Sequence, residues 1–155
     1  MVKAIPDEYP QVIPYLTVDG ADAAITFYIE VLGAKERVRM ASPDGQVGHA
    51  ELEIGRGLVM LSDEFPEMGG KSPRTVGGTP VAMMVYVDDV DDVFQRAVER
   101  GAKPVRPVEN QFYGDRSGAF EDPFGHSWHV STHIEDVPED EMARRAAEAM
   151  GGGPA

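Results

Sequence analysis

PYLTVDGADAAITFYIEVLGAKERV, residues 14–38, is repeated by VAMMVYVDDVDDVFQRAVERGAKPV, residues 81–105, and this repeat decides the fold. Val18-Asp19 recurs as Val87-Asp88, and the tripeptide GAK stands near the end of both copies. A repeat of about half the chain indicates two copies of one supersecondary unit.

Each copy reads as a strand followed by a helix. A short β-rich run ends at an acidic residue that can cap the helix. The candidates for this cap are Asp19 and Asp22 in the first copy and Asp88 and Asp89 in the second. Apolar residues follow at the i, i+3 and i+4 spacing that is typical of a buried helix face. A glycine then stands where a left-handed cap is expected to end each helix. These glycines are Gly33 and Gly101.

Three more strands are predicted after each helix, separated by turn sequences such as PDGQ and DPFG. They cover residues 36–42, 48–55 and 57–64 in the first half and residues 103–108, 114–122 and 126–132 in the second. Each half is therefore predicted to be a βαβββ unit, which makes the fold α+β. Pairing the two halves would form a curved mixed sheet with a concave cup.

Four segments are expected along the chain. The first βαβββ half covers residues 1–64, a Gly/Pro-rich linker covers residues 65–80, the second half covers residues 81–133, and a C-terminal helical tail covers residues 134–155. The linker is predicted to loop out of the fold. The tail is predicted to be a helix that covers the cup, packs on a partner subunit or frays.

Composition excludes several classes of function. The chain has 155 residues, 42% of them hydrophobic, and no cysteine, so disulfides, thiolate nucleophiles and cysteine-based zinc sites are ruled out. A net charge of −13 repels phosphate backbones, which argues against nucleic acid and anionic membranes as partners. No apolar run approaches the roughly 18 residues of a membrane span, and the N-terminus does not read as a signal peptide. We expect a cytoplasmic protein with a small-molecule ligand, and its acidic charge suits a cationic one.

Several motifs resemble a known family. FYIEVLGA, the duplicated βαβββ pattern and EDPFGHSWHV are similar to the vicinal-oxygen-chelate superfamily, which includes glyoxalase I, bleomycin-resistance proteins and extradiol dioxygenases. GHAELEIG, DEFPEMGG and EMARRAA further resemble the PhnB-like branch. The resemblance covers about residues 10–133 and implies a homodimer whose cups are completed across the interface. It does not imply one reaction, because the superfamily hosts many chemistries on one fold.

The run DPFGHSWHVSTHIEDV holds three of the four histidines, His126, His129 and His133. The run reads as turn and strand, so Trp128 and Val130 should face the helices while His129 and His133 face the cup. At a strand rise of roughly 3.3 Å per residue, His129 and His133 lie about 13 Å apart. One zinc ion needs each nitrogen within about 2.1 Å, so these two histidines cannot share it.

The resemblance also implies where a metal would bind, at one inward residue on the first and last strands of each half. Those positions are Ile13, Leu61, Ala82 and His129. Only the histidine can bind a metal, so we predict no glyoxalase-type metal centre and no cofactor. A divalent metal held by His49 or Glu51 together with His129 remains the alternative to polar groups that line a wet pocket.

The ligand-binding candidates come from three strands and one loop. They are Tyr15, Met84, Phe112, Tyr113, Arg116 and His129. The loop NQFYGDRSG supplies Tyr113, which could stack or donate a hydrogen bond, and Arg116, which could bind a carboxylate or phosphate. Alternatively, Arg116 forms a structural salt bridge with Asp115 or Asp122.

Three hypotheses for function follow. The first is a metal-free protein that binds a small organic molecule in the cup, as bleomycin-resistance proteins do. The second is a lyase, isomerase or dioxygenase that uses a metal or acid–base residues, with His49, Glu51 and His129 as catalytic candidates. The third is a structural role for the tail and the linker. The missing metal ligands and the acidic charge favour the first hypothesis.

Overall fold

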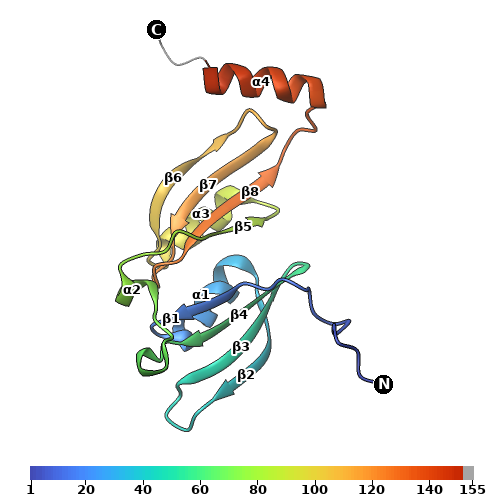
Figure 1. Ribbon diagram of the computed structural model, residues 1–155. Helices are drawn as coiled ribbons and strands as arrows, with labels where there is room; N and C mark the ends of the chain where they lie inside the picture. The colour runs from blue at the N-terminus through green and yellow to red at the C-terminus, as the bar shows by residue number, and fades with distance from the viewer. Residues whose placement is uncertain (152–155) are drawn as a thin grey trace. The chain divides into compact units, whose positions relative to one another are not determined.

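The computed structural model describes residues 1–151, and these residues form two compact units. The first unit comprises residues 1–81 and residues 122–126, and the second comprises residues 82–121 and 127–151. Each unit contains one four-stranded sheet with a helix packed on it (Figure 1). The predicted α+β fold of two βαβββ units is therefore confirmed.

The first sheet is built by the first half of the chain. Its elements are β1 (Tyr15–Val18), α1 (Ala21–Leu32), β2 (Lys35–Ala41), β3 (Val47–Ile54) and β4 (Gly57–Asp63). The strand order is β1-β4-β3-β2, with β1 parallel to β4 and the other pairs antiparallel. The chain can make the parallel β1–β4 pair because α1 and two further strands lie between them.

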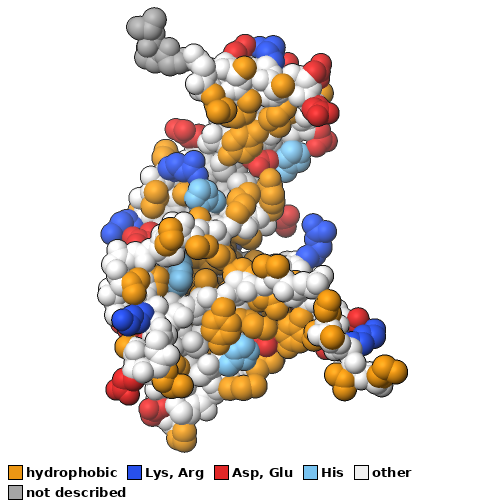
Figure 2. All heavy atoms as spheres, viewed as in Figure 1, with side chains coloured by type: hydrophobic (Ala, Val, Ile, Leu, Met, Phe, Trp, Pro, Cys, Tyr) orange, Lys and Arg blue, Asp and Glu red, His pale blue; other side chains and the backbone are white. Residues whose placement is uncertain are grey.

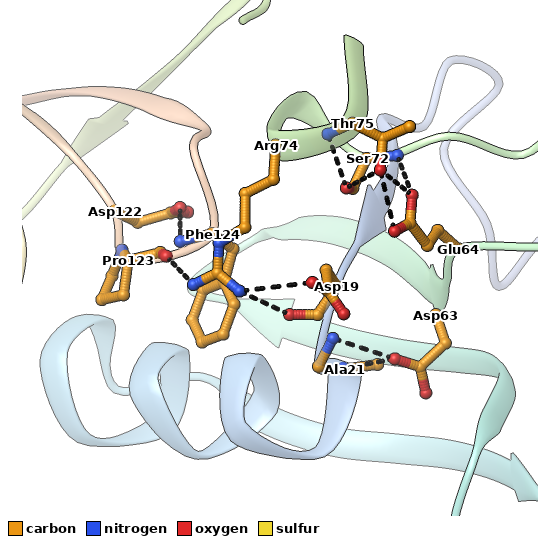
Figure 3. A network of polar contacts seen from close by, with 11 residues as sticks. Asp19, Ala21, Asp63, Glu64, Ser72, Arg74, Thr75, Asp122, Pro123 and Phe124 are labelled. Carbon is orange, nitrogen blue, oxygen red and sulfur yellow. Dashed lines mark hydrogen bonds and ion pairs between the residues drawn. The ribbon is translucent and has the colours of Figure 1, made fainter. Parts of the chain in front are cut away.

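The start of α1 is capped by a residue from another strand. The predicted cap, Asp19 or Asp22, is wrong, since Gly20 holds the N-cap position and makes no side-chain cap bond. Instead, the Asp63 carboxylate on β4 accepts the backbone N–H groups of Gly20 and Ala21 at 3.1 and 2.8 Å (Figure 3). This contact satisfies amides that would otherwise be unpaired at the helix start.

One face of α1 forms the core of the first unit. Ile25 and Tyr28 are fully buried, as the helical spacing predicts, whereas Ile29 is 40% exposed. Gly33 ends the helix in a left-handed conformation at φ 68°, which confirms the predicted glycine cap.

The Gly/Pro-rich linker is folded, so the prediction that it loops out is wrong. It contains the short helices η1 (Pro66–Met68) and α2 (Pro73–Val76). The Glu64 carboxylate accepts hydrogen bonds from the Ser72 amide at 3.0 Å and the Thr75 hydroxyl at 2.6 Å (Figure 3). These contacts tie the linker to the end of β4.

A turn from the second half of the sequence, residues 122–126, belongs to the first unit. Tyr28 donates a hydrogen bond to the Asp122 carboxylate. Phe124 packs edge-on against Phe27 with ring centroids 6.3 Å apart. Arg74 of the linker lies over the Phe124 ring and donates to backbone oxygens of Asp19 and Pro123 (Figure 3).

The second sheet repeats the plan of the first. Its elements are β5 (Ala82–Tyr86), α3 (Val90–Glu99), β6 (Lys103–Asn110), β7 (Asp115–Glu121) and β8 (Ser127–His133). The strand order is β5-β8-β7-β6. The first and last strands of this βαβββ unit in the sequence, β5 and β8, again form a parallel pair. Asp89 caps α3 by accepting the Asp92 amide, as predicted.

Strand β8 has the predicted two faces. Trp128 and Val130 are buried on the side of α3, whose Phe94 ring contacts Phe120 of the neighbouring strand. The tail forms helix α4 (Glu139–Gly151), which contacts the second unit through Arg145. Within residues 1–151, no helix has the length and apolar character that crossing a membrane requires.

Candidate functional site

The first sheet carries a chain of polar side chains on its open face, the face turned away from α1. Ala50 and Leu52 of β3 are buried on the side of α1, so the alternation of the strand turns His49 and Glu51 to the open face. The Tyr15 hydroxyl lies 2.9 Å from His49 Nδ1, and His49 Nε2 lies 2.9 Å from a Glu51 carboxylate oxygen. The structure thus brings together three of the residues that the sequence singled out.

Glu51 is a buried acid, with only 4% of its surface exposed. The N-terminal arm, residues 1–13, covers it, and the Tyr9 hydroxyl donates to its second carboxylate oxygen at 2.9 Å. Arg37 adds a weaker ion pair at 3.9 Å and lies over the Tyr9 ring. The hydrogen bond from His49 is the main cause that lowers the pKa of Glu51, with the Tyr9 hydrogen bond also contributing, so this carboxylate is ionised at neutral pH.

A hollow of about 530 Å³ opens beside Glu51. Its other walls are mostly apolar and are Ala4, Ile5, Pro6, Tyr9, Pro10, Gln11, Ile13 and Met60. Figure 2 shows hydrophobic side chains gathered on this face of the first unit next to a histidine. An apolar hollow with one ionised acid can hold an apolar molecule that directs a basic or hydrogen-bond-donating group at the carboxylate. Sequence reasoning missed the arm because nothing in its composition signals that it folds back over β3.

On the second sheet, Met84 and His129 lie side by side on the open face, the face turned away from α3. They are partners in the parallel β5–β8 ladder, and Met84 is 52% exposed. Arg106 of β6 donates to His129 Nδ1 at 3.0 Å. His129 is therefore oriented by an arginine in the second unit, whereas His49 and Glu51 belong to the first.

A second polar cluster lies on the same face. The buried Asp115 carboxylate accepts from the Tyr86 hydroxyl at 2.8 Å and bonds His133 Nδ1 at 2.8 Å. His133 Nε2 also contacts Asp136 at 2.8 Å. The hydrogen bond to Asp115 is the main cause that raises the pKa of His133, and the hydrogen bond to Asp136 contributes as well. Sequence reasoning placed His133 on this face but did not identify Asp115 or Tyr86.

Arg116 lies on the opposite face of the second sheet, so its predicted position beside a ligand with His129 is wrong. Strand alternation turns Arg116 toward α3, where its guanidinium group forms a bidentate ion pair with the Asp91 carboxylate at 2.8 and 2.9 Å. The salt-bridge alternative was correct in kind, although its partner is Asp91 rather than Asp115 or Asp122.

The two aromatic candidates of the preceding loop contact each other. Phe112 and Tyr113 pack edge to face with centroids 5.2 Å apart, and Phe112 is 38% exposed. The Tyr113 hydroxyl lies 3.4 Å from the Ser117 hydroxyl on the open face. Arg145 of α4 donates to the Phe112 carbonyl, so the tail holds this loop in place.

The residues implied as metal positions are mostly side chains without a metal-binding atom. Leu61 is fully buried in the core with α1, which corrects its assignment to the inward face, and Met60 takes that face instead. Ile13 precedes β1 and lines the hollow. The side chains of Leu61, Ile13 and Ala82 have no atom that can bind a metal, so the set does not fit a glyoxalase-type centre. Across residues 1–151, no group of three or more histidines and acids is arranged to hold a metal ion.

Comparisons with known proteins agree with this fold. Residues 11–130 match the family model described as Glyoxalase/Bleomycin resistance protein/Dioxygenase superfamily. The uncharacterized protein Mb0911c of Mycobacterium bovis is 46% identical over 136 residues, covering 86% of this chain and 90% of that protein. Protein PA1353 from Pseudomonas aeruginosa superimposes with a TM-score of 0.68 at 24% identity, covering 81% of this chain and 99% of its own. The PhnB protein from Bacillus cereus gives a TM-score of 0.63 at 16% identity, covering 79% and 99%. At these identities the structural likeness is one of fold.

Proposed function

Because the chain belongs to the Glyoxalase/Bleomycin resistance protein/Dioxygenase superfamily, we propose that it binds a small organic molecule without the help of a metal. The binding site is the hollow on the open face of the first sheet, beside Glu51. The ligand has an apolar body and one basic or hydrogen-bond-donating group.

A single observation carries this proposal, the ionised carboxylate of Glu51 at the edge of an apolar hollow. A buried charge is costly unless it is paired and hydrogen-bonded. Glu51 has hydrogen bonds from Tyr9 and His49, but its nearest fixed cation, Arg37, stands 3.9 Å away. A ligand cation would complete the pairing, and the net charge of −13 would favour the approach of such a ligand.

Substitution of Glu51 tests the site. A panel of aromatic and aliphatic amines is screened by thermal unfolding, since a ligand that binds the folded state raises the melting temperature. Hits are then titrated by calorimetry. We expect Glu51→Gln to weaken binding by about tenfold or more, because a charge-assisted contact worth roughly 1.5–3 kcal/mol is lost.

Glu53→Gln is the matched control. Glu53 stands two residues further along β3, also contacts Arg37, and has a side chain that is 46% exposed. Amines should bind this variant as they bind the parent protein. Equal affinity of both variants, or a screen in which only neutral molecules bind, would refute the role of Glu51.

An enzyme that uses acid–base residues is the second candidate. It is favoured by the continuous hydrogen-bond chain from the Tyr15 hydroxyl through His49 to Glu51, because such a chain can move a proton. Ligands from the same screen are incubated with the protein and followed by mass spectrometry. If the parent protein converts a ligand to a product and His49→Gln does not, the enzyme is the better candidate. If ligands bind and are not converted, the metal-free binding protein is supported.

The narrower family features complete the proposal. The motifs GHAELEIG and DEFPEMGG, together with the likeness of fold to the PhnB protein, support the PhnB-like branch. A homodimer is expected from the same family resemblance, and we propose a cytoplasmic location. Sedimentation velocity should give about twice the 16.8 kDa of one chain, and a monomer at all concentrations would refute the dimer.

A further inference from the structure

The first unit has a second hollow, of about 290 Å³, at the other end of β1. Strand β1, the linker and the turn 122–126 form its walls. The lining residues are Tyr15, Thr17, Lys71, Pro73, Val76, Gly78, Thr79, Pro80 and His126. It shares only Tyr15 with the polar chain that runs to Glu51, and no residue lines both hollows.

His126 is 9% exposed, and its ring is held in one orientation. Its Nε2 lies 2.9 Å from the carbonyl oxygen of Thr17, which can only accept a hydrogen bond. In the neutral ring Nε2 therefore carries the proton and Nδ1 is left as an acceptor. In residues 1–151 every fully buried side-chain nitrogen or oxygen has a partner, and no partner is found for Nδ1. Nδ1 is consequently not fully buried, and the side chain that carries it lines the hollow.

Two more polar groups in this hollow lack partners. Lys71 is exposed and forms no ion pair with any residue of the described chain, 1–151. The Thr17 hydroxyl likewise makes no hydrogen bond within that range. The hollow thus offers an ammonium group, a hydroxyl group and an imidazole acceptor, surrounded by prolines and a valine.

The walls of the hollow are fixed before any ligand arrives. Figure 3 shows Glu64 bonded to Ser72 and Thr75 at one end of α2, and Arg74 bridging Asp19 to the turn at Pro123. The backbone of α2 and of the turn is held in this way, so the walls lose little conformational freedom on binding, which favours affinity.

We propose that this hollow is a second binding site, for a small hydroxycarboxylate. The ligand carboxylate pairs with the Lys71 ammonium, and the ligand hydroxyl donates to His126 Nδ1. Thr17 supplies a hydroxyl that can donate to the carboxylate. The site does not depend on Glu51 and so stands apart from the amine site proposed above.

The test is a titration of the full chain with glycolate, followed by amide and imidazole NMR spectra. We expect saturable shifts at Thr17, Lys71 and the His126 ring. Acetate, which lacks the hydroxyl, should bind about tenfold more weakly, the equivalent of one hydrogen bond of roughly 1.4 kcal/mol.

Variants decide the outcome. Lys71→Met and Thr17→Val should each weaken glycolate binding, and Lys71→Met should do so by at least tenfold. Lys35→Met is the control, because Lys35 is also an exposed lysine of the first unit but lies on β2. Glu51→Gln should leave glycolate affinity unchanged, which separates this site from the amine site. Shifts that do not saturate, acetate binding equal to glycolate binding, or unchanged affinity in Lys71→Met would overturn the proposal.

Discussion

Glu51 is a buried carboxylate, and side-chain donors occupy both of its oxygens. The strand period alone turns it away from α1, but burial comes from the N-terminal arm, which brings Tyr9 within 2.9 Å. The same arm builds the apolar walls of the hollow. One residue therefore connects the fold of the arm to the chemistry of the proposed site.

The stability of the protein should depend on pH through this residue. The pKa of Glu51 is lowered in the folded state, mainly by the His49 hydrogen bond, so the folded state binds fewer protons than the unfolded state. The stabilisation is fully present above the ordinary glutamate pKa and is lost as pH falls through the lowered value. Urea unfolding at a series of pH values from neutral to acid measures the effect.

The comparison variant is Glu51→Gln, which keeps the shape of the side chain but cannot titrate. The difference in free energy of unfolding between the parent protein and this variant should shrink as pH falls. A difference that is independent of pH would show that Glu51 has the same pKa in both states.

Among the elements, the linker and the turn 122–126 pack closely on each other. A Cβ atom at Gly125 would stand 2.7 Å from the Cβ atom of Pro73, and Gly125 has φ +93°. Arg74 adds contacts from the same short helix to Pro123 and Phe124. This packing forms two walls of the second hollow.

Alanine at Gly125 tests the contact, with alanine at Gly45 as a matched control. Gly45 has nearly the same backbone conformation, φ +89°, but nothing lies within 4 Å of its Cβ position. Both variants carry the strain of a left-handed alanine, roughly 1–2 kcal/mol. Gly125→Ala should lose about 1–3 kcal/mol more, because the packed contact must move. Equal losses in urea unfolding would mean that the turn and the linker adjust freely.

For the whole molecule, the two structural units do not coincide with the two halves of the sequence. The turn 122–126 completes the first unit by pairing Asp122 with Tyr28 and Phe124 with Phe27. The duplicated pattern would suggest a boundary between the halves that leaves each one self-sufficient.

Residues 1–81 on their own should therefore fail to fold cooperatively. Without the turn, the hydroxyl of Tyr28 loses its buried partner and the Phe27 ring is uncovered, which together cost several kcal/mol of the small stability that a domain of this size has. Thermal unfolding followed by circular dichroism should show a broad transition. A sharp transition like that of the full chain would contradict this view.

The sequence predicted the βαβββ repeat closely, because hydrophobic periodicity and turn residues are local signals. It also placed His49, Glu51 and His129 on the correct strand faces, since alternation depends only on register. It failed for Arg116, which was expected in a loop beside the cup but lies on β7 and pairs with Asp91. It also failed for Leu61, where an error of one position reverses the face of the sheet.

By itself the sequence determined the fold class and the two faces of each sheet, because both follow from patterns a few residues long. Only the tertiary structure decided that the linker folds, that Asp63 caps α1, and that Tyr9 and His126 line hollows. The hydrogen bonds of Asp63, Tyr9 and His126 join residues 42 to 109 positions apart in the chain. Long-range pairs of this kind leave no periodic trace, since they depend on where packing brings distant segments together.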